Sequence, residues 1–222
     1  MVSDPAVADL TLDELRARLA AAIAAVAGFD GWGDEAIAAA ADAVGVDRAA
    51  AAYAFRGGAM DMIAAWTTHV DAAMAAAFTA DALAALPMRE RIRRLVRFRL
   101  ASVAGQRESL RRALAIMAQP VNTARAVRLG WRTADAMWRL AGDTATDYNH
   151  YSKRAILGGI YAATLAVLVG DDSEGQADTM AFLDRRIEGI MRFEKAKGQL
   201  LRPTEQRFSM VRLLGRLRYP AT

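Results

Sequence analysis

The 222-residue chain contains no cysteine and only two histidines, so disulfides and thiolate metal sites are excluded and a zinc centre has few candidate ligands. Apolar residues make up 54% of it, which suffices for one well-buried domain. The formal net charge is +4, and no apolar run reaches the length that spans a bilayer.

Helical periodicity dominates the sequence, the abundant alanine favours helix, and no segment alternates as a strand would, so we predict an all-α fold. Glycine and proline separate the predicted segments. In chain order the expected helices cover residues 10–27, 34–44, 47–55, from after Gly58 to about 78, 87–104, 108–118, 120–142, from about 147 to 169, 176–197 and 204–218.

The first third has the spacing of a helix-turn-helix, with Ile37 and Ala41 facing inward and Gly45 at the turn. This spacing resembles the DNA-binding half of TetR-type regulators, and the following all-α segment has the length of their ligand-binding half. The alternative function is therefore a ligand-responsive transcriptional regulator. The second helix, 47–55, argues against it: four successive alanines and one arginine offer little to bases or phosphates. We expect no nucleic-acid partner.

Six arginines crowd the helix expected at 87–104, at positions 89, 91, 93, 94, 97 and 99. They point around much of the helix and alternate with apolar residues. Because the body of the protein is close to neutral, pairing with acidic groups of the same chain is the favoured interpretation. Docking on an acidic partner or on lipid headgroups is the alternative.

A polar, aromatic segment joins the helices expected at 120–142 and 147–169. Gly142 and Asp143 end the first of them, since glycine tolerates the left-handed conformation of a helix C-cap. Thr146 or Asp147 can cap the second. Residues 147–151 read Asp-Tyr-Asn-His-Tyr, so either a recognition surface or an ordinary polar junction fits the spacing.

Catalytic and metal-binding patterns are scarce. Neither His69 nor His150 has a glutamate three residues before it, so no di-iron carboxylate pair is predicted. The chain has no phosphate loop, dinucleotide fingerprint or nucleophile elbow. We therefore expect no enzyme activity, no cofactor and no metal.

The motif Ala-Gly-Asp-x-x-Thr-Asp-Tyr-Asn-x-Tyr-x-x-Arg at 141–154 resembles the signature of the lipid-binding accessory family of ubiquinone biosynthesis, the ninth protein of the coenzyme Q set. The resemblance extends from about residue 28 to residue 192. It implies a non-enzymatic protein of TetR-like fold that binds a polyprenyl quinone intermediate or a phospholipid. It also implies presentation of that lipid to the demethoxyubiquinone hydroxylase.

The resemblance assigns roles to three sets of residues. The family's partner-binding patch matches positions here, although relatives carry tryptophan where this chain has His150, so a strong aromatic anchor is lost. That patch is Met137, Asp147, Tyr148, Asn149, His150, Tyr151 and Arg154. The expected lipid-binding residues are Leu114, Met117, Trp138, Ile156, Ile160, Tyr161 and Ile187. The expected membrane-binding residues are Met210, Leu213, Leu214, Leu217, Arg212 and Arg216.

The tail carries the charge excess: residues 202–222 contain five arginines and one glutamate, so +5 − 1 = +4, which equals the net charge of the whole chain. An apolar stripe beside arginines is typical of a helix lying on an anionic membrane, and docking on the body or on a second subunit is the alternative. We expect three regions, 1–80, 81–200 and 201–222, and a homodimer. The acidic N-terminus lacks the features of a secretory or transit peptide, so we expect the bacterial cytoplasm, peripheral to the inner membrane.

Overall fold

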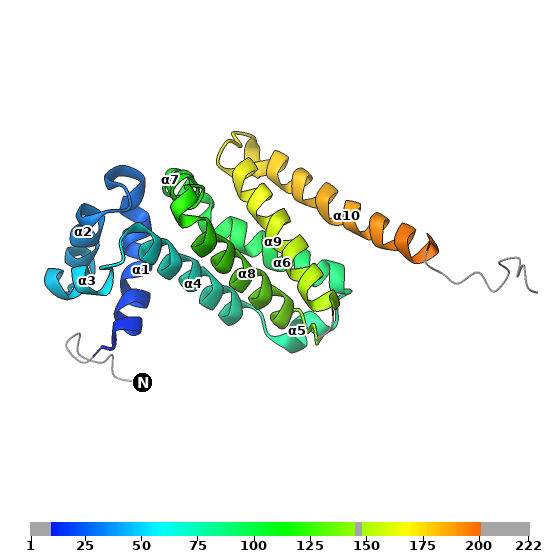
Figure 1. Ribbon diagram of the computed structural model, residues 1–222, viewed down its shortest axis with the longest axis horizontal. Helices are drawn as coiled ribbons and strands as arrows, with labels where there is room; N and C mark the ends of the chain where they lie inside the picture. The colour runs from blue at the N-terminus through cyan, green and yellow to red at the C-terminus, as the bar shows by residue number, and fades with distance from the viewer. Residues whose placement is uncertain (1–9, 145–147, 201–222) are drawn as a thin grey trace, which may run out of the picture. The chain divides into compact units, whose positions relative to one another are not determined.

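The computed structural model describes residues 10–144 and 148–200, and these ranges contain helices and no strand (Figure 1). The predicted all-α class is therefore confirmed. The chain divides into two compact units, Met1–Asp184 and Arg185–Thr222, and each is described by itself. The three regions expected from the sequence stay a prediction.

The helices follow the predicted order closely. They are α1 (Leu12–Asp30), α2 (Asp34–Val44), α3 (Arg48–Ala54), α4 (Ala59–Ala77), α5 (Ala80–Ala84), α6 (Met88–Ala104), α7 (Arg107–Met117), η2 (Pro120–Asn122), α8 (Thr123–Leu140), α9 (Tyr148–Leu168), η3 (Glu174–Gln176) and α10 (Ala177–Leu200). Several differ from expectation: α5 and η3 were not predicted, α1 is longer than expected, and Pro120 begins a 3-10 turn rather than the long helix α8.

Local signals explain where the helices begin and end. Thr11 and Glu14 form a reciprocal capping box at the start of α1, which satisfies free backbone amides. Gly45 ends α2 in the left-handed conformation, at φ 71°, as the helix-turn-helix spacing requires. The helix α1 runs past the expected break and ends before Gly31, which has φ 80° and donates to the carbonyl oxygen of Ala27. Gly28 packs on α7, where a Cβ would lie 3.1 Å from Ser109 Oγ.

The N-terminal helices share a core with the helices that follow them. Trp32 Nε1 donates a hydrogen bond to the carbonyl oxygen of Ser109 at 3.0 Å, and Ser109 Oγ donates to the carbonyl oxygen of Ala24 at 2.7 Å. Trp32 also packs on Trp66 of α4, with ring centroids 5.5 Å apart. These buried contacts join α1, α4 and α7 within the first unit.

Five of the six arginines of α6, at positions 91, 93, 94, 97 and 99, bind groups of the same chain, as the favoured interpretation predicted. Arg91 donates to the carbonyl oxygens of Leu86, Ala84 and Ala141. Carboxylates take the others: Arg93 and Arg94 pair with Glu90, Arg93 and Arg97 with Asp184, and Arg99 with Asp71.

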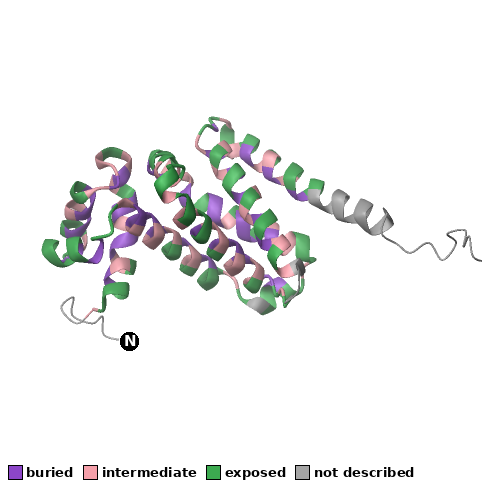
Figure 2. Cartoon of the chain, viewed as in Figure 1, coloured by how far each residue is buried: buried purple, intermediate pink, exposed green. Residues whose placement is uncertain are grey.

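The helix-turn-helix is formed by α2 and α3, and α3 is largely exposed (Figure 2). Its only arginine, Arg48, is held by the carboxylate of Asp42, with Nε 2.8 Å from Oδ1. Tyr53 is the large exposed side chain of this helix, and Arg56 lies over its ring. The surface that would face a DNA groove is thus mainly alanine.

Candidate functional site

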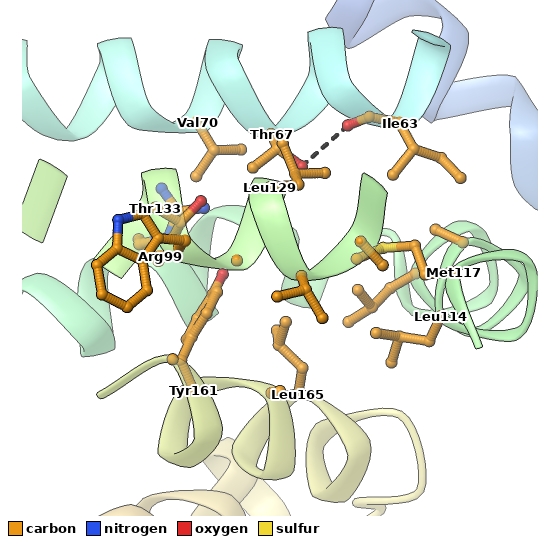
Figure 3. A pocket seen from close by; sticks show the side chains of 18 of the residues that line it. Ile63, Thr67, Val70, Arg99, Leu114, Met117, Leu129, Thr133, Tyr161 and Leu165 are labelled. Atoms are coloured by element: carbon orange, nitrogen blue, oxygen red, sulfur yellow. Dashed lines mark hydrogen bonds between the residues drawn. The ribbon is translucent and has the colours of Figure 1, made fainter. Parts of the chain in front are cut away.

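A cavity of about 640 Å³ lies inside the first unit, among α4, α6, α7, α8 and α9 (Figure 3). A volume of this size is typical of small-molecule sites, which are mostly apolar with few polar groups. The lining is Ile63, Trp66, Thr67, Val70, Arg99, Val103, Leu110, Ala113, Leu114, Met117, Ala118, Ala126, Val127, Leu129, Gly130, Trp131, Thr133, Arg154, Ala155, Gly158, Gly159, Tyr161, Ala162 and Leu165.

Glycines leave room in the walls that α8 and α9 contribute. A Cβ at Gly158 would lie 3.8 Å from the carbonyl oxygen of Gly130, so the two backbones approach each other closely there. At Gly130 and Gly159 a Cβ would meet no atom within 4 Å. The exposed side chain of Val127, at 65%, shows that the cavity opens to the surface beside α8.

One end of the cavity is polar. Arg99, from α6, is only 2% exposed and pairs with the carboxylate of Asp71 on α4. Its guanidinium carbon lies 5.0 Å from the centroid of the Tyr161 ring, a cation–π contact. Thr133 of α8 is buried at the same end, and Figure 3 shows the Tyr161 hydroxyl pointing toward Arg99 and Thr133.

Burial changes the pKa values of the ionisable side chains at this end of the cavity. Desolvation raises the pKa of Asp71, although the positive charge of Arg99 and its hydrogen bond oppose the rise. Burial likewise raises the pKa of the Tyr161 hydroxyl, so it is neutral at physiological pH. Thr133 lies close enough to Asp71 to lower its pKa, yet the Thr133 hydroxyl makes no hydrogen bond of normal geometry.

The segment between α8 and α9 is held by a buried ion network. Arg154 Nε lies 2.6 Å from Asp135 Oδ1, and Arg154 Nη1 lies 3.1 Å from Asp143 Oδ2 and donates to the carbonyl oxygen of His150 at 3.1 Å. Lys153 Nζ adds a 2.7 Å contact to Asp143. Burial opposes ionisation of Asp143, but the hydrogen bonds and charges of Lys153 and Arg154 outweigh it and lower its pKa.

The expected partner-binding residues differ in how far they are exposed, and their role stays a prediction. Arg154 is 2% exposed and Met137 is fully buried, so neither presents its side chain at the surface; Arg154 is used up in joining α8 to α9. Tyr151 is 62% exposed, beside His150 and Trp131. Tyr148 and Asn149 begin α9, whereas Asp147 lies outside the described residues.

Some of the expected lipid-binding residues line the cavity and others do not. Leu114, Met117 and Tyr161 line the cavity. Trp138, Ile156 and Ile160 do not: Trp138 Nε1 instead donates to the carbonyl oxygen of Lys153 at 3.1 Å, and Ile156 is 39% exposed. They project from other faces of α8 and α9 than the cavity residues do.

The remaining expected sites lie elsewhere in the chain. Ile187 belongs to the second unit. The tail residues Met210, Leu213, Leu214, Leu217, Arg212 and Arg216 lie outside the described residues. Across 10–144 and 148–200, no helix has the length and apolarity needed to cross a bilayer, and no three potential metal ligands gather.

Sequence comparisons connect this chain to one family. Residues 123–194, which include all of α8 and α9 and most of α10, match the family model for COQ9. The mitochondrial ubiquinone biosynthesis protein COQ9 of Rattus norvegicus is 34% identical over 168 residues, which are 72% of this chain and 54% of that protein. The Homo sapiens protein of the same name is 31% identical over 186 residues, 81% of this chain and 58% of that protein.

The chain belongs to the COQ9 family. It spans little more than half the length of the curated relatives it matches. Its fold is also that of a TetR transcriptional regulator from Nitrosomonas europaea ATCC 19718, with a TM-score of 0.61 at 22% identity over 78% of this chain and 96% of that chain. The COQ9 family and the TetR-like fold, both expected from the sequence, are thus confirmed.

Proposed function

We propose that this COQ9-family chain is a non-enzymatic, lipid-binding accessory protein of ubiquinone biosynthesis, whose cavity holds the apolar chain of a polyprenyl quinone intermediate. The observation that carries the proposal is the 640 Å³ cavity with its largely apolar lining. The curated relatives support it, since their names place them in ubiquinone biosynthesis. The alternative of a TetR-type regulator is disfavoured by the alanine surface of α3.

Apolar burial supplies the driving force for such a ligand. Each buried CH₂ group contributes about 0.8 kcal/mol, so each five-carbon isoprene unit contributes roughly 4 kcal/mol before the costs of association are subtracted. Leu114, Met117 and Leu165 surround the apolar part of the cavity. Methionine adapts its shape to an apolar ligand, which suits a flexible chain.

Presentation to the demethoxyubiquinone hydroxylase remains part of this proposal. The exposed ring of Tyr151, beside His150 at the start of α9, supports a contact surface there, because exposed aromatic side chains are enriched at interfaces. The arginine-rich sequence of 202–222 supports attachment to an anionic membrane. A homodimer peripheral to the bacterial inner membrane completes the proposal.

The test is quinone binding by variants in which the cavity is filled. Decylubiquinone is titrated into the full chain, and quenching of the lining residues Trp66 and Trp131 reports binding. We expect Leu165→Phe to weaken binding at least tenfold, because the added ring occupies the space of the alkyl chain. The matched control, Val121→Phe, adds the same ring at a position 82% exposed and outside the lining, and it should leave binding unchanged.

Two results would refute the proposal. One is failure of the wild-type chain to bind decylubiquinone in detergent-free buffer or with nanodiscs of anionic lipid. The other is equal affinity of Leu165→Phe and Val121→Phe, provided that circular dichroism shows both variants folded.

A further inference from the structure

We propose that the Arg99–Thr133 end of the cavity is a head-group subsite that takes a neutral oxygen acceptor, such as a quinone carbonyl or a methoxy or hydroxyl oxygen, and discriminates against an anionic head. This inference rests on the proposed function, because it names the ligand chemistry of the same cavity.

Two buried polar side chains at this end keep donors free. Arg99 and Thr133 are each 2% exposed, and both line the cavity. Neither Arg99 Nε nor Thr133 Oγ1 has a hydrogen-bond partner. A buried donor without a partner is costly, and a ligand that supplies an acceptor removes that cost.

Both arginines of the lining already have carboxylate partners. The carboxylate of Asp71 binds Arg99 through Nη1. Arg154 is paired with Asp135 and Asp143, two carboxylates that also bind Arg139 and Lys153. A carboxylate or phosphate head would therefore enter a desolvated site and compete with these aspartates for the arginines, which is unfavourable.

The position of the subsite fits a head followed by an apolar chain. Tyr161 packs on Arg99 at the polar end, and Figure 3 shows Leu114 and Met117 at the opposite side of the cavity. A ligand with oxygen atoms at one end and hydrocarbon beyond it satisfies both ends. A plain hydrocarbon leaves the two donors unpaired.

The experiment compares three probes that share a ring and a ten-carbon chain. Decylubiquinone carries neutral oxygens, decylbenzene carries none, and 4-decylbenzoate carries an anion. Binding of the first is followed by tryptophan quenching, and binding of the other two by displacement of the first. We expect 4-decylbenzoate to bind at least tenfold more weakly than decylubiquinone at pH 7.5.

Variants of Thr133 identify the donor. Thr133→Val removes the hydroxyl at nearly constant shape and should weaken decylubiquinone about 3- to 10-fold, the effect of one neutral hydrogen bond. Its affinity for decylbenzene should not change. Thr133→Ser retains the hydroxyl and should bind decylubiquinone like the wild type.

A paired variant tests the arginine without leaving an uncompensated carboxylate. The double variant Arg99→Met, Asp71→Leu removes both charges together. It should lower the affinity for decylubiquinone. The ratio of the decylubiquinone affinity to the 4-decylbenzoate affinity should fall by less than threefold. The Thr133 series decides the matter if this double variant does not fold.

The outcomes separate this inference from the proposed function. If decylubiquinone and decylbenzene both fail to bind the wild type, the proposed function is wrong. If both bind, but Thr133→Val leaves the affinity for decylubiquinone unchanged or 4-decylbenzoate binds as tightly as the quinone, the cavity holds lipid and the head-group subsite is refuted.

Discussion

Two buried arginines of the first unit, Arg99 and Arg154, look equivalent by burial and differ in how their donors are used. Each is 2% exposed and each pairs with aspartate. Arg154 joins α8 to α9 and leaves none of its nitrogens buried without a partner. Arg99 faces the polar end of the cavity with Nε unpartnered.

The difference separates a structural arginine from a binding one. A buried charge held by carboxylates on neighbouring segments stabilises one arrangement of the helices, and its loss leaves charges unpaired. A buried donor without a hydrogen-bond partner can gain one when a ligand supplies an acceptor. Burial alone does not distinguish the two roles, whereas the count of used donors does.

The largest effect is expected from Arg154→Met. The variant leaves the Asp143 and Asp135 carboxylates without their buried partner, so we expect a loss of about 3–5 kcal/mol in the free energy of unfolding. Urea denaturation followed by circular dichroism measures it. Lys153→Met is the control, because the Lys153 side chain is 38% exposed and its loss should cost far less.

A stable Arg154→Met variant would contradict the structural role assigned to Arg154. If it unfolded like the wild type but lost binding to the hydroxylase, Arg154 would act at the partner surface, as the sequence pattern suggested. The buried network would then contribute little to stability.

A smaller effect is expected on the way the unfolding free energy depends on pH. The pKa of Asp143 is lowered in the folded protein, so its contribution to stability is present above the ordinary aspartate pKa of about 3.9 and is lost as the pH falls through its folded value. The pKa of Asp71 is raised, so the sign is opposite: its ionisation removes stability as the pH rises from about 3.9 through its folded value.

The two aspartates can be separated by variants. The unfolding free energy is measured from pH 3 to pH 7 for the wild type, Asp71→Asn and Asp143→Asn. The stability of Asp71→Asn relative to the wild type should rise as the pH rises above about 4. The stability of Asp143→Asn relative to the wild type should fall as the pH rises from 3 through about 4, and should then stay nearly constant. The opposite slopes would overturn the assigned signs.

The smallest effect is expected from Arg48, an arginine paired at the surface. Its pair with Asp42 is exposed on both sides, and exposed pairs contribute little. Arg48→Ala should leave the melting temperature unchanged. Neither it nor the wild type should shift duplex DNA from its own upstream region in an electrophoretic assay at 150 mM salt. If the wild type shifts the DNA at this salt concentration and Arg48→Ala does not, the hypothesis of a transcriptional regulator would be favoured instead.

The fold was largely predictable from local patterns. Periodicity and the signals at Gly45 and Gly142 place most helix ends within a few residues. Two features were not predictable in this way. The short helix α5 is capped by Thr79, and α1 continues through Gly28, which packs against Ser109 of α7 far away in the sequence, to Asp30 before the positive-φ Gly31.

The candidate site was less predictable, because it depends on contacts between distant residues. The motif at 141–154 drew attention to Arg154 but could not show that Asp135 would bury it. The polar end of the cavity unites Asp71, Arg99 and Thr133 from three helices, and no local spacing connects them. The crowded arginines of α6 were visible in the sequence, but which of them turned inward was not.

The glycines of the cavity wall also have a meaning for the protein's evolution. A glycine inside a helix costs about 0.5–1 kcal/mol relative to alanine, and Gly130, Gly158 and Gly159 all occupy such positions without a positive φ. None of their added Cβ atoms would clash. The mutations that most easily raise the melting temperature are therefore the ones that begin to fill the binding space. Selection for thermostability alone would close the cavity, one methyl group at a time.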